Sequence, residues 1–201
     1  AGYRPGEEIF LALDPASTEF YRNGKYHLDG EDRVLDGGEM TAYYQDLVDC
    51  YSIISIEDGM AEDDWAGWDA LTQAVVDQAQ IVGDDLYATN TSIIKNGIVS
   101  NASNAVLIKP NQIGTLTETL DAIATTRDAG WSAIISHRSA ETEDTMISDL
   151  AIGTGTRQIK AGAPARSERT AKYNRLLNIE AELAEKVSFA GESAYQQTLD
   201  N

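Results

Sequence analysis

Six short apolar segments alternate along the chain with segments of amphipathic, helical pattern. The apolar segments predict strands at residues 9–14, 52–58, 79–86, 105–109, 132–139 and 157–162. Strands this apolar, each followed by a helix, indicate a parallel sheet that is buried on both faces. The hydrophobic pattern therefore predicts an α/β fold.

The intervening segments place their apolar residues three or four positions apart, which is the spacing of one helix face. The clearest of these segments are residues 63–76, 114–126 and 167–183. The residues predicted to share a face are Trp68, Leu71 and Val75 in the first, Leu116, Leu120 and Ile123 in the second, and Leu176, Ile179 and Leu183 in the third. Thr115 and Glu118 predict a capping box at the start of the second helix.

A parallel sheet of this kind is either open and doubly wound or part of a (β/α)8 barrel. A doubly wound nucleotide-binding fold is expected to carry a glycine-rich phosphate loop after its first strand. The first predicted strand is followed by DPASTEFYRNGKYHLD, which contains no such motif. A barrel instead carries functional polar residues at the carboxyl ends of many strands. We therefore predict a partial TIM-type barrel of six βα units, in which residues 22–32 form a small hairpin or loop.

Composition limits the partners and the compartment. The formal net charge of −18 repels nucleic acid and anionic membranes, so neither is an expected partner. No apolar run reaches the roughly 18 residues that a membrane-spanning helix needs. Cys50 is the only cysteine, which argues against a disulfide framework and a cysteine-based zinc site and fits the cytoplasm. The acidic balance indicates a solvated surface, a salt-rich habitat or a need for divalent cations. An anionic substrate would require a local cluster of cationic groups.

Charged and polar residues follow the apolar runs at every predicted strand end. These residues are Asp14, Glu57, Asp84, Lys109, His137, Arg138, Ser139 and Lys160. Because the carboxyl ends of barrel strands meet at one mouth, their side chains are expected to face one another.

Three of these residues are carboxylates that follow three different strands: Asp14, Glu57 and Asp84. Oxygen ligands with no cysteine and a single histidine nearby suit a hard cation such as Mg²⁺. Each acid alone is better explained as a strand-end cap or a partner in a structural ion pair, and it is the joint position of the three that favours a metal site. Asp85 is expected to cap a helix or support the site, because neighbouring strand residues point to opposite faces.

The cationic strand-end residues suit the removal of a proton from a carbon next to a carboxylate. A lysine beside a divalent cation and a second ammonium gives up its proton more readily, which suits a general base. Lys109 is therefore the candidate base for a proton α to a carboxylate, with the metal stabilising the resulting enediolate. Lys160 and Arg138 would form the cationic pocket, and Arg138 suits bidentate binding of phosphate or carboxylate. His137 is expected to contact the substrate or its phosphate, and an ordinary packed histidine is the alternative.

Several long motifs resemble the enolase family. They run almost end to end, as ALDPASTEFY, SIEDGMAEDDW, VGDDLYATN, LIKPNQIGTLTET, SHRSAETEDT, QIKAGAP and RSERTAKYN. The resemblance implies the reversible dehydration of 2-phosphoglycerate to phosphoenolpyruvate in glycolysis and gluconeogenesis. It also implies Mg²⁺ as the cofactor and a homodimer or higher oligomer.

The resemblance also implies a role for each strand-end residue. Asp14, Glu57 and Asp84 look like the ligands of magnesium, and Glu57 and Asp84 also lie at the substrate. Lys109 matches the family's proton acceptor. His137, Arg138 and Ser139 match the loop that holds the substrate phosphate. Lys160 matches the lysine at the substrate carboxylate. The resemblance thus implies three catalytic residues, Lys109, His137 and Lys160.

Three positions depart from the family pattern. Pro110 stands where enolases usually carry an apolar β-branched residue, Ala140 replaces a usual glycine, and Ala161 replaces a usual threonine. Proline is uncommon inside a paired central strand. Either pairing ends before Pro110, or Lys109 is shifted.

A complete barrel of this type has eight strands and about 250 residues, whereas six strand ends are found here. We therefore expect residues 1–201 to be the C-terminal catalytic barrel domain of an enolase, incomplete at its N-terminal side and lacking the glutamates of the acid step. One alternative is a catalytically incompetent piece that acts as a scaffold or binding module. Another is a superfamily member that acts on a different carboxylate.

Overall fold

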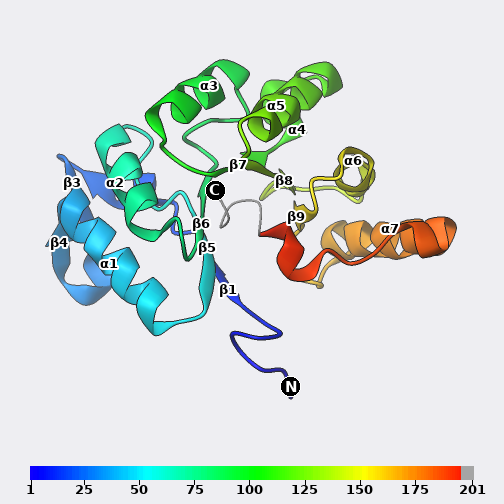
Figure 1. Ribbon diagram of the computed structural model, residues 1–201, viewed down its shortest axis with the longest axis horizontal. Helices are drawn as coiled ribbons and strands as arrows, with labels where there is room; N and C mark the ends of the chain where they lie inside the picture. Colours follow the sequence, from blue (N-terminus) through cyan, green and yellow to red (C-terminus); the bar gives the residue numbers. More distant parts are fainter. Residues whose placement is uncertain (196–201) are drawn as a thin grey trace.

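The six predicted strands form one parallel sheet in a computed structural model that describes residues 1–195 (Figure 1). The strand order is β1-β5-β6-β7-β8-β9. The strands are β1 (Leu11–Leu13), β5 (Ile53–Glu57), β6 (Gln80–Gly83), β7 (Ala105–Ile108), β8 (Ser132–Ser136) and β9 (Gln158–Lys160). Each lies within its predicted segment and is shorter than it. The sheet curls into part of a barrel, which confirms the predicted fold class.

Helices cover the outer side of the curled sheet (Figure 1). They are α1 (Gly37–Cys50), α2 (Trp65–Val75), α3 (Thr91–Ser100), α4 (Pro110–Ile113), α5 (Leu116–Asp128), α6 (Met146–Thr154) and α7 (Ser167–Leu183), with 3-10 turns at Ser17–Phe20, Asp29–Glu31, Ala184–Lys186 and Gly191–Ala194. Among residues 1–195 no helix combines the length and the apolarity needed to cross a membrane.

The segment predicted as a hairpin or loop is a small antiparallel sheet. It consists of β2 (Tyr21–Arg22), β3 (Lys25–Leu28) and β4 (Arg33–Leu35), with β3 in the middle. Tyr26 of β3 is fully buried, and its hydroxyl donates to Asp64 Oδ2 at 2.7 Å. This contact ties the small sheet to the start of α2, because Asp64 also caps that helix.

The strands bury different residues on their two faces. Ile56, Ile81, Val106 and Ile135 belong to the large core between sheet and helices. The alternate positions Val82, Ala105, Leu107 and Ile134 form a second, smaller cluster on the inner face. Full burial of an aliphatic side chain of this size contributes about 1.5–3 kcal/mol. Both faces of the sheet therefore bury apolar side chains, as is typical of a parallel sheet.

The predicted helix faces are confirmed for α2, where Trp68, Leu71 and Val75 are all buried. In α7 only Ile179 is fully buried, while Leu176 is half-buried and Leu183 is exposed. The face predicted for α5 is wrong for two of its three residues, Leu116 and Leu120.

Leu116 and Leu120 of α5 are exposed, at 53% and 42%, and only Ile123 is buried. The buried face is made instead by Thr119, Ala122, Ile123 and Thr126. The two threonine hydroxyls donate to carbonyls four residues back, Thr119 to Thr115 and Thr126 to Ala122, both at 2.8 Å. Threonine can therefore be buried without an unpaired polar group. The capping prediction is confirmed in part, since Thr115 accepts from the Glu118 N–H at 3.2 Å.

Candidate active site

Five of the eight strand-end residues point to the inner face of the sheet. Side chains alternate between the two faces of a strand, so a residue two positions beyond an inward residue also points inward. Asp84 follows Val82 in this way, and Lys109 follows Leu107. Glu57 pairs with Val82 on the neighbouring strand. Asp14 and Lys160 line the same inner cavity as Glu57.

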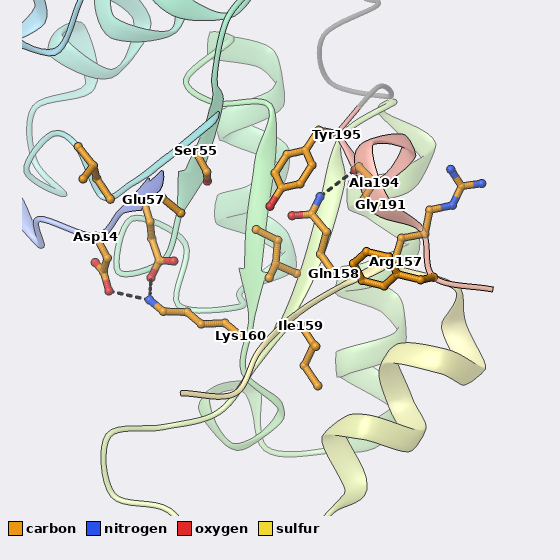
Figure 2. A pocket seen from close by; sticks show the side chains of 14 residues that line it. Asp14, Ser55, Glu57, Arg157, Gln158, Ile159, Lys160, Gly191, Ala194 and Tyr195 are labelled. Atoms are coloured by element: carbon orange, nitrogen blue, oxygen red, sulfur yellow. Dashed lines mark hydrogen bonds and ion pairs between the residues drawn. The ribbon is translucent and has the colours of Figure 1, made fainter. Parts of the chain in front are cut away.

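Lys160 joins two of the three carboxylates. Its Nζ donates to Asp14 Oδ2 at 2.6 Å and to Glu57 Oε1 at 2.7 Å (Figure 2). Burial alone would lower the pKa of Lys160, but the Glu57 and Asp14 carboxylates outweigh it and raise that pKa. Lys160 is therefore held as a cation at the end of β9.

Glu57 is the most deeply buried residue of this group, with 6% of its surface exposed. Burial raises its pKa to about 7, although the Lys160 ammonium opposes this change. The carboxylates of Asp14 and Asp84 raise it further. The site thus contains a carboxyl group that needs positive charge nearby in order to stay ionised.

Lys109 pairs with the third carboxylate. Its Nζ lies 2.5 Å from Asp84 Oδ2, and both side chains are nearly buried. The backbone N–H of Lys109 donates to Thr89 Oγ1 at 2.9 Å, and the Thr89 hydroxyl donates to Gln112 Oε1 at 2.9 Å. Burial raises the pKa of Asp84, and Lys109 counteracts that rise. The other oxygen, Asp84 Oδ1, is buried and has no hydrogen-bond partner among residues 1–195.

Asp58 supports Asp84 and was not among the predicted site residues. Its Oδ1 accepts from the Asp84 N–H at 2.8 Å, and its Oδ2 accepts from the Asp85 N–H at 2.9 Å. Within residues 1–195, carboxylate oxygens of Asp58, Asp84 and Asp85 lie within 4.8 Å of one another, whereas the predicted trio forms no such compact group. Burial raises the pKa of Asp58 to about 7. Both Asp58 oxygens are occupied by backbone donors, so we regard it as a support for the turn.

The segment His137–Ser139 follows β8 and lies beside β9. The His137 N–H donates to the Lys160 carbonyl at 2.9 Å, and Arg138 Nη1 donates to Asn111 Oδ1 at 3.1 Å. Arg169 of α7, which sequence reasoning missed, donates to His137 Nδ1, to the Arg138 carbonyl at 2.8 Å and to the Ser139 carbonyl at 2.9 Å. Burial and then Arg169 and Lys160 lower the pKa of His137.

Pro110 does not interrupt the sheet. β7 ends at Ile108, which pairs with Ile135, and Pro110 is the first residue of α4. Proline is favoured at that position because its missing N–H would have no partner there. Of the two expectations for Pro110, the structure bears out that pairing has already ended. Ala140 is exposed and Ala161 is buried.

An inner cavity of about 370 Å³ lies beside these residues (Figure 2). Asp14, Glu57 and Lys160 line one part of it, and Gly191, Ala194 and Tyr195 line another. Gln158 stands between them and donates to the Ala194 carbonyl at 2.9 Å. The cavity therefore presents both charged and apolar walls on the inside of the curled sheet.

The donor set at the strand ends fits a hard divalent cation. Every candidate ligand is a carboxylate oxygen, which is the ligand type Mg²⁺ prefers. Asp84 Oδ1 is buried and has no hydrogen-bond partner among residues 1–195, so it is available to a cation. Asp14 and Glu57 already bind a positive charge, that of Lys160. Asp14, Glu57 and Asp84 have the ligand chemistry of a magnesium site, but within residues 1–195 the compact carboxylate group is that of Asp58, Asp84 and Asp85.

Comparison with known proteins identifies the relatives of this chain. Residues 1–198 match the family model described as the C-terminal TIM barrel domain of enolase. The protein named Enolase 1 from Methanospirillum hungatei is 56% identical over 191 residues. That match covers 95% of this chain and 45% of the relative, so the chain spans about half the length of that protein.

Proposed function

The chain belongs to the enolase family and matches the family's C-terminal barrel domain, and we propose that the whole protein catalyses the reversible dehydration of 2-phosphoglycerate to phosphoenolpyruvate. The reaction would make it a lyase that depends on Mg²⁺. The arrangement that best supports this proposal is the convergence of three carboxylates and two lysines at the carboxyl ends of five strands.

Lys109 is the proposed general base. It follows a central strand, its side chain is nearly buried, and its backbone N–H is held by Thr89. A base fixed in this way can meet the proton α to a carboxylate with little reorganisation. Asp84 Oδ2 holds Lys109 Nζ in place on the inner face, and Lys109 acts as the base once its ammonium group has lost a proton.

Asp14, Glu57 and Asp84 are the proposed magnesium ligands. Asp84 can contact Lys109 through one oxygen while its other oxygen stays available for the cation. A bound Mg²⁺ supplies positive charge that stabilises the carboxylate of the substrate once the α proton has left. The backbone bonds from Asp84 and Asp85 to Asp58 keep the Asp84 turn in position for this role.

The cationic groups of the site are proposed to bind the two anionic ends of the substrate. Lys160 would contact the substrate carboxylate, because its Nζ lies among the candidate metal ligands. His137, Arg138 and Ser139 would contact the phosphate. Arg138 is well suited because a guanidinium can bind two phosphate oxygens at once.

The proposal extends to assembly and location. We expect a homodimer or a higher oligomer in the cytoplasm, with 2-phosphoglycerate and phosphoenolpyruvate as the ligands. Light scattering of the native protein would test the first expectation, and a strictly monomeric species would contradict it.

The decisive experiment is a phosphoenolpyruvate-formation assay on the purified native protein. We expect turnover with Mg²⁺, loss of turnover with EDTA, and recovery when Mg²⁺ is restored. Absence of turnover in the presence of Mg²⁺ would overturn the proposal. It would then favour the second candidate, a scaffold or binding module, for which the exposed apolar residues Ile9 and Leu11 at the β1 edge offer a surface.

A further inference from the structure

Arg169 makes three contacts with the segment His137–Ser139 across a gap of about thirty residues in sequence. It stands near the start of α7, and one of its nitrogens donates to His137 Nδ1 and to the Arg138 carbonyl at 2.8 Å. Its second terminal nitrogen donates to the Ser139 carbonyl at 2.9 Å. A single guanidinium therefore binds all three consecutive residues.

The contact with His137 determines where the imidazole proton lies. A guanidinium has N–H donors and no acceptor, and it stays protonated in proteins. Since Arg169 can only donate, His137 Nδ1 must accept and carry no proton. The ring proton then lies on Nε2, and the imidazole is neutral.

We propose that Arg169 is a positioning residue that holds the segment His137–Ser139 and fixes His137 as the neutral tautomer with its proton on Nε2. His137 then offers an N–H donor to an anion without adding a full charge. Only the identity of that anion, the substrate phosphate, rests on the proposed function. The contacts of Arg169 and the tautomer do not depend on it.

The charges around His137 favour the same state. Arg169 from α7, Lys160 from β9 and Lys109 after β7 are cationic, and Glu141 is the acidic group that opposes them. Burial lowers the pKa of His137 first, and Arg169 and Lys160 lower it further, against Glu141. Burial and the neighbouring cations thus favour the neutral imidazole.

Neighbouring residues of α7 hold the continuation of this segment. Lys172, with 1% of its surface exposed, donates to the carbonyl of Thr142, to the Glu168 carbonyl at 2.7 Å and lies 3.2 Å from Glu141 Oε2. Gly162 leaves the space that Arg169 needs, because a Cβ at that position would lie 2.9 Å from Arg169 Cδ and 3.1 Å from His137 Cε1. α7 therefore fixes residues 137–142 through two cationic side chains.

The test is ¹⁵N NMR of the His137 ring in the native full-length protein, with the signal assigned by its loss in His137→Asn. We expect the wild type to show a protonated Nε2 and an unprotonated Nδ1 at pH 7. In Arg169→Met we expect a mixture of tautomers and a titration midpoint that moves upward. Arg169→Gln keeps an N–H donor but no charge, so it should retain the tautomer while its midpoint rises.

Arg175→Met is the matched control. Arg175 is on the same helix but pairs with Asp149 and Glu182, so its removal should leave the His137 spectrum unchanged. A protonated Nδ1 in the wild type, or an unaltered spectrum in Arg169→Met, would overturn the proposal. If Arg169→Met does not fold, Arg169→Gln decides, since an unmoved midpoint there contradicts the proposal as well.

Kinetics separate this proposal from the proposed function. If both are right, Arg169→Met raises the KM for 2-phosphoglycerate by about tenfold, which is what the loss of one charged hydrogen bond produces, and Arg175→Met does not. If the wild type has no dehydratase activity, the proposed function fails while the NMR result still decides the role of Arg169.

Discussion

Lys160 Nζ lies 2.6 Å from Asp14 Oδ2, although 146 positions separate the two residues. Asp14 follows β1 and Lys160 ends β9. β1 and β9 are the two edge strands of the parallel sheet. The same ammonium lies 2.7 Å from Glu57 Oε1. One lysine thus links both edges of the curled sheet at the end where the candidate site is located.

The proposed base can be tested by Lys109→Ala in the complete protein. We expect turnover to fall by about a hundredfold or more, as removal of a general base does, while Mg²⁺ affinity stays largely intact. Lys95→Ala is the control, because Lys95 is an exposed lysine on α3. Near-normal turnover in Lys109→Ala would show that another group takes the proton.

The metal site can be tested by Asp84→Asn. The substitution replaces the Asp84 carboxylate, whose Oδ1 is buried and unpaired among residues 1–195, by a neutral amide. We expect Mg²⁺ affinity, measured by isothermal titration calorimetry, to fall by about tenfold or more. Asp121→Asn is the control, since Asp121 is an exposed carboxylate on α5, away from the strand ends. Unchanged affinity in Asp84→Asn would count against the ligand assignment.

The support role of Asp58 can be tested by Asp58→Asn. An amide can accept one of the two backbone N–H groups, but its own N–H₂ would then face the other. We expect the free energy of unfolding in urea to fall by about 1–3 kcal/mol. Asp77→Asn, at an exposed position after α2, should change it little. Equal stability of the two variants would mean that the bonds to Asp84 and Asp85 contribute nothing.

Glu57 predicts a pH dependence of stability in metal-free buffer. Its folded-state pKa of about 7 lies above the ordinary value of 4.5 because of burial, so the folded state binds the proton more tightly. The stabilisation is complete below pH 4.5 and is lost as the pH rises through 7, by at most about 1.4 kcal/mol per pH unit. Glu57→Gln should flatten this part of the profile in urea unfolding with EDTA. Parallel profiles for the two proteins would contradict the raised pKa.

The sheet edges predict how residues 1–201 behave when expressed alone. β1 and β9 have unpaired outer edges within residues 1–195, and Leu11 of β1 is 51% exposed. Unpaired apolar edges promote aggregation. We expect this piece to aggregate and to unfold without a cooperative transition in calorimetry. A sharp, reversible transition of a monomer would refute this.

The strands and their inward residues were predictable because apolar runs that end in a charge leave few alternatives. The face of α5 was not, because its buried positions are threonines and alanine while its leucines are exposed. A hydrophobicity pattern cannot show that the Thr119 hydroxyl is satisfied by its own helix. The sequence predicted which residues stand at the strand ends. The catalytic and binding roles assigned to those residues are still predictions.

Asp58 and Arg169 were missed for a common reason. Asp58 binds the backbone N–H groups of Asp84 and Asp85, and two of the three Arg169 contacts are backbone carbonyls. Backbone groups are the same at every position, so such contacts leave no trace in residue types. The available signals were two motifs of the family resemblance, SIEDGMAEDDW, which carries Asp58, and RSERTAKYN, which carries Arg169.

The side-chain amides of Gln80 and Gln158 pair with each other inside the curled sheet, and this pair bears on how the chain folds. Gln80 Nε2 donates to Gln158 Oε1 at 3.2 Å, and Gln158 Nε2 donates to Gln80 Oε1 at 2.9 Å. β6 and β9, which carry them, are separated by β7 and β8. The pair can therefore close only after the intervening strands have docked and the sheet has acquired its curvature. Contacts of such long sequence separation form slowly, so the Gln80–Gln158 pair should mark one of the last steps in the kinetics of folding.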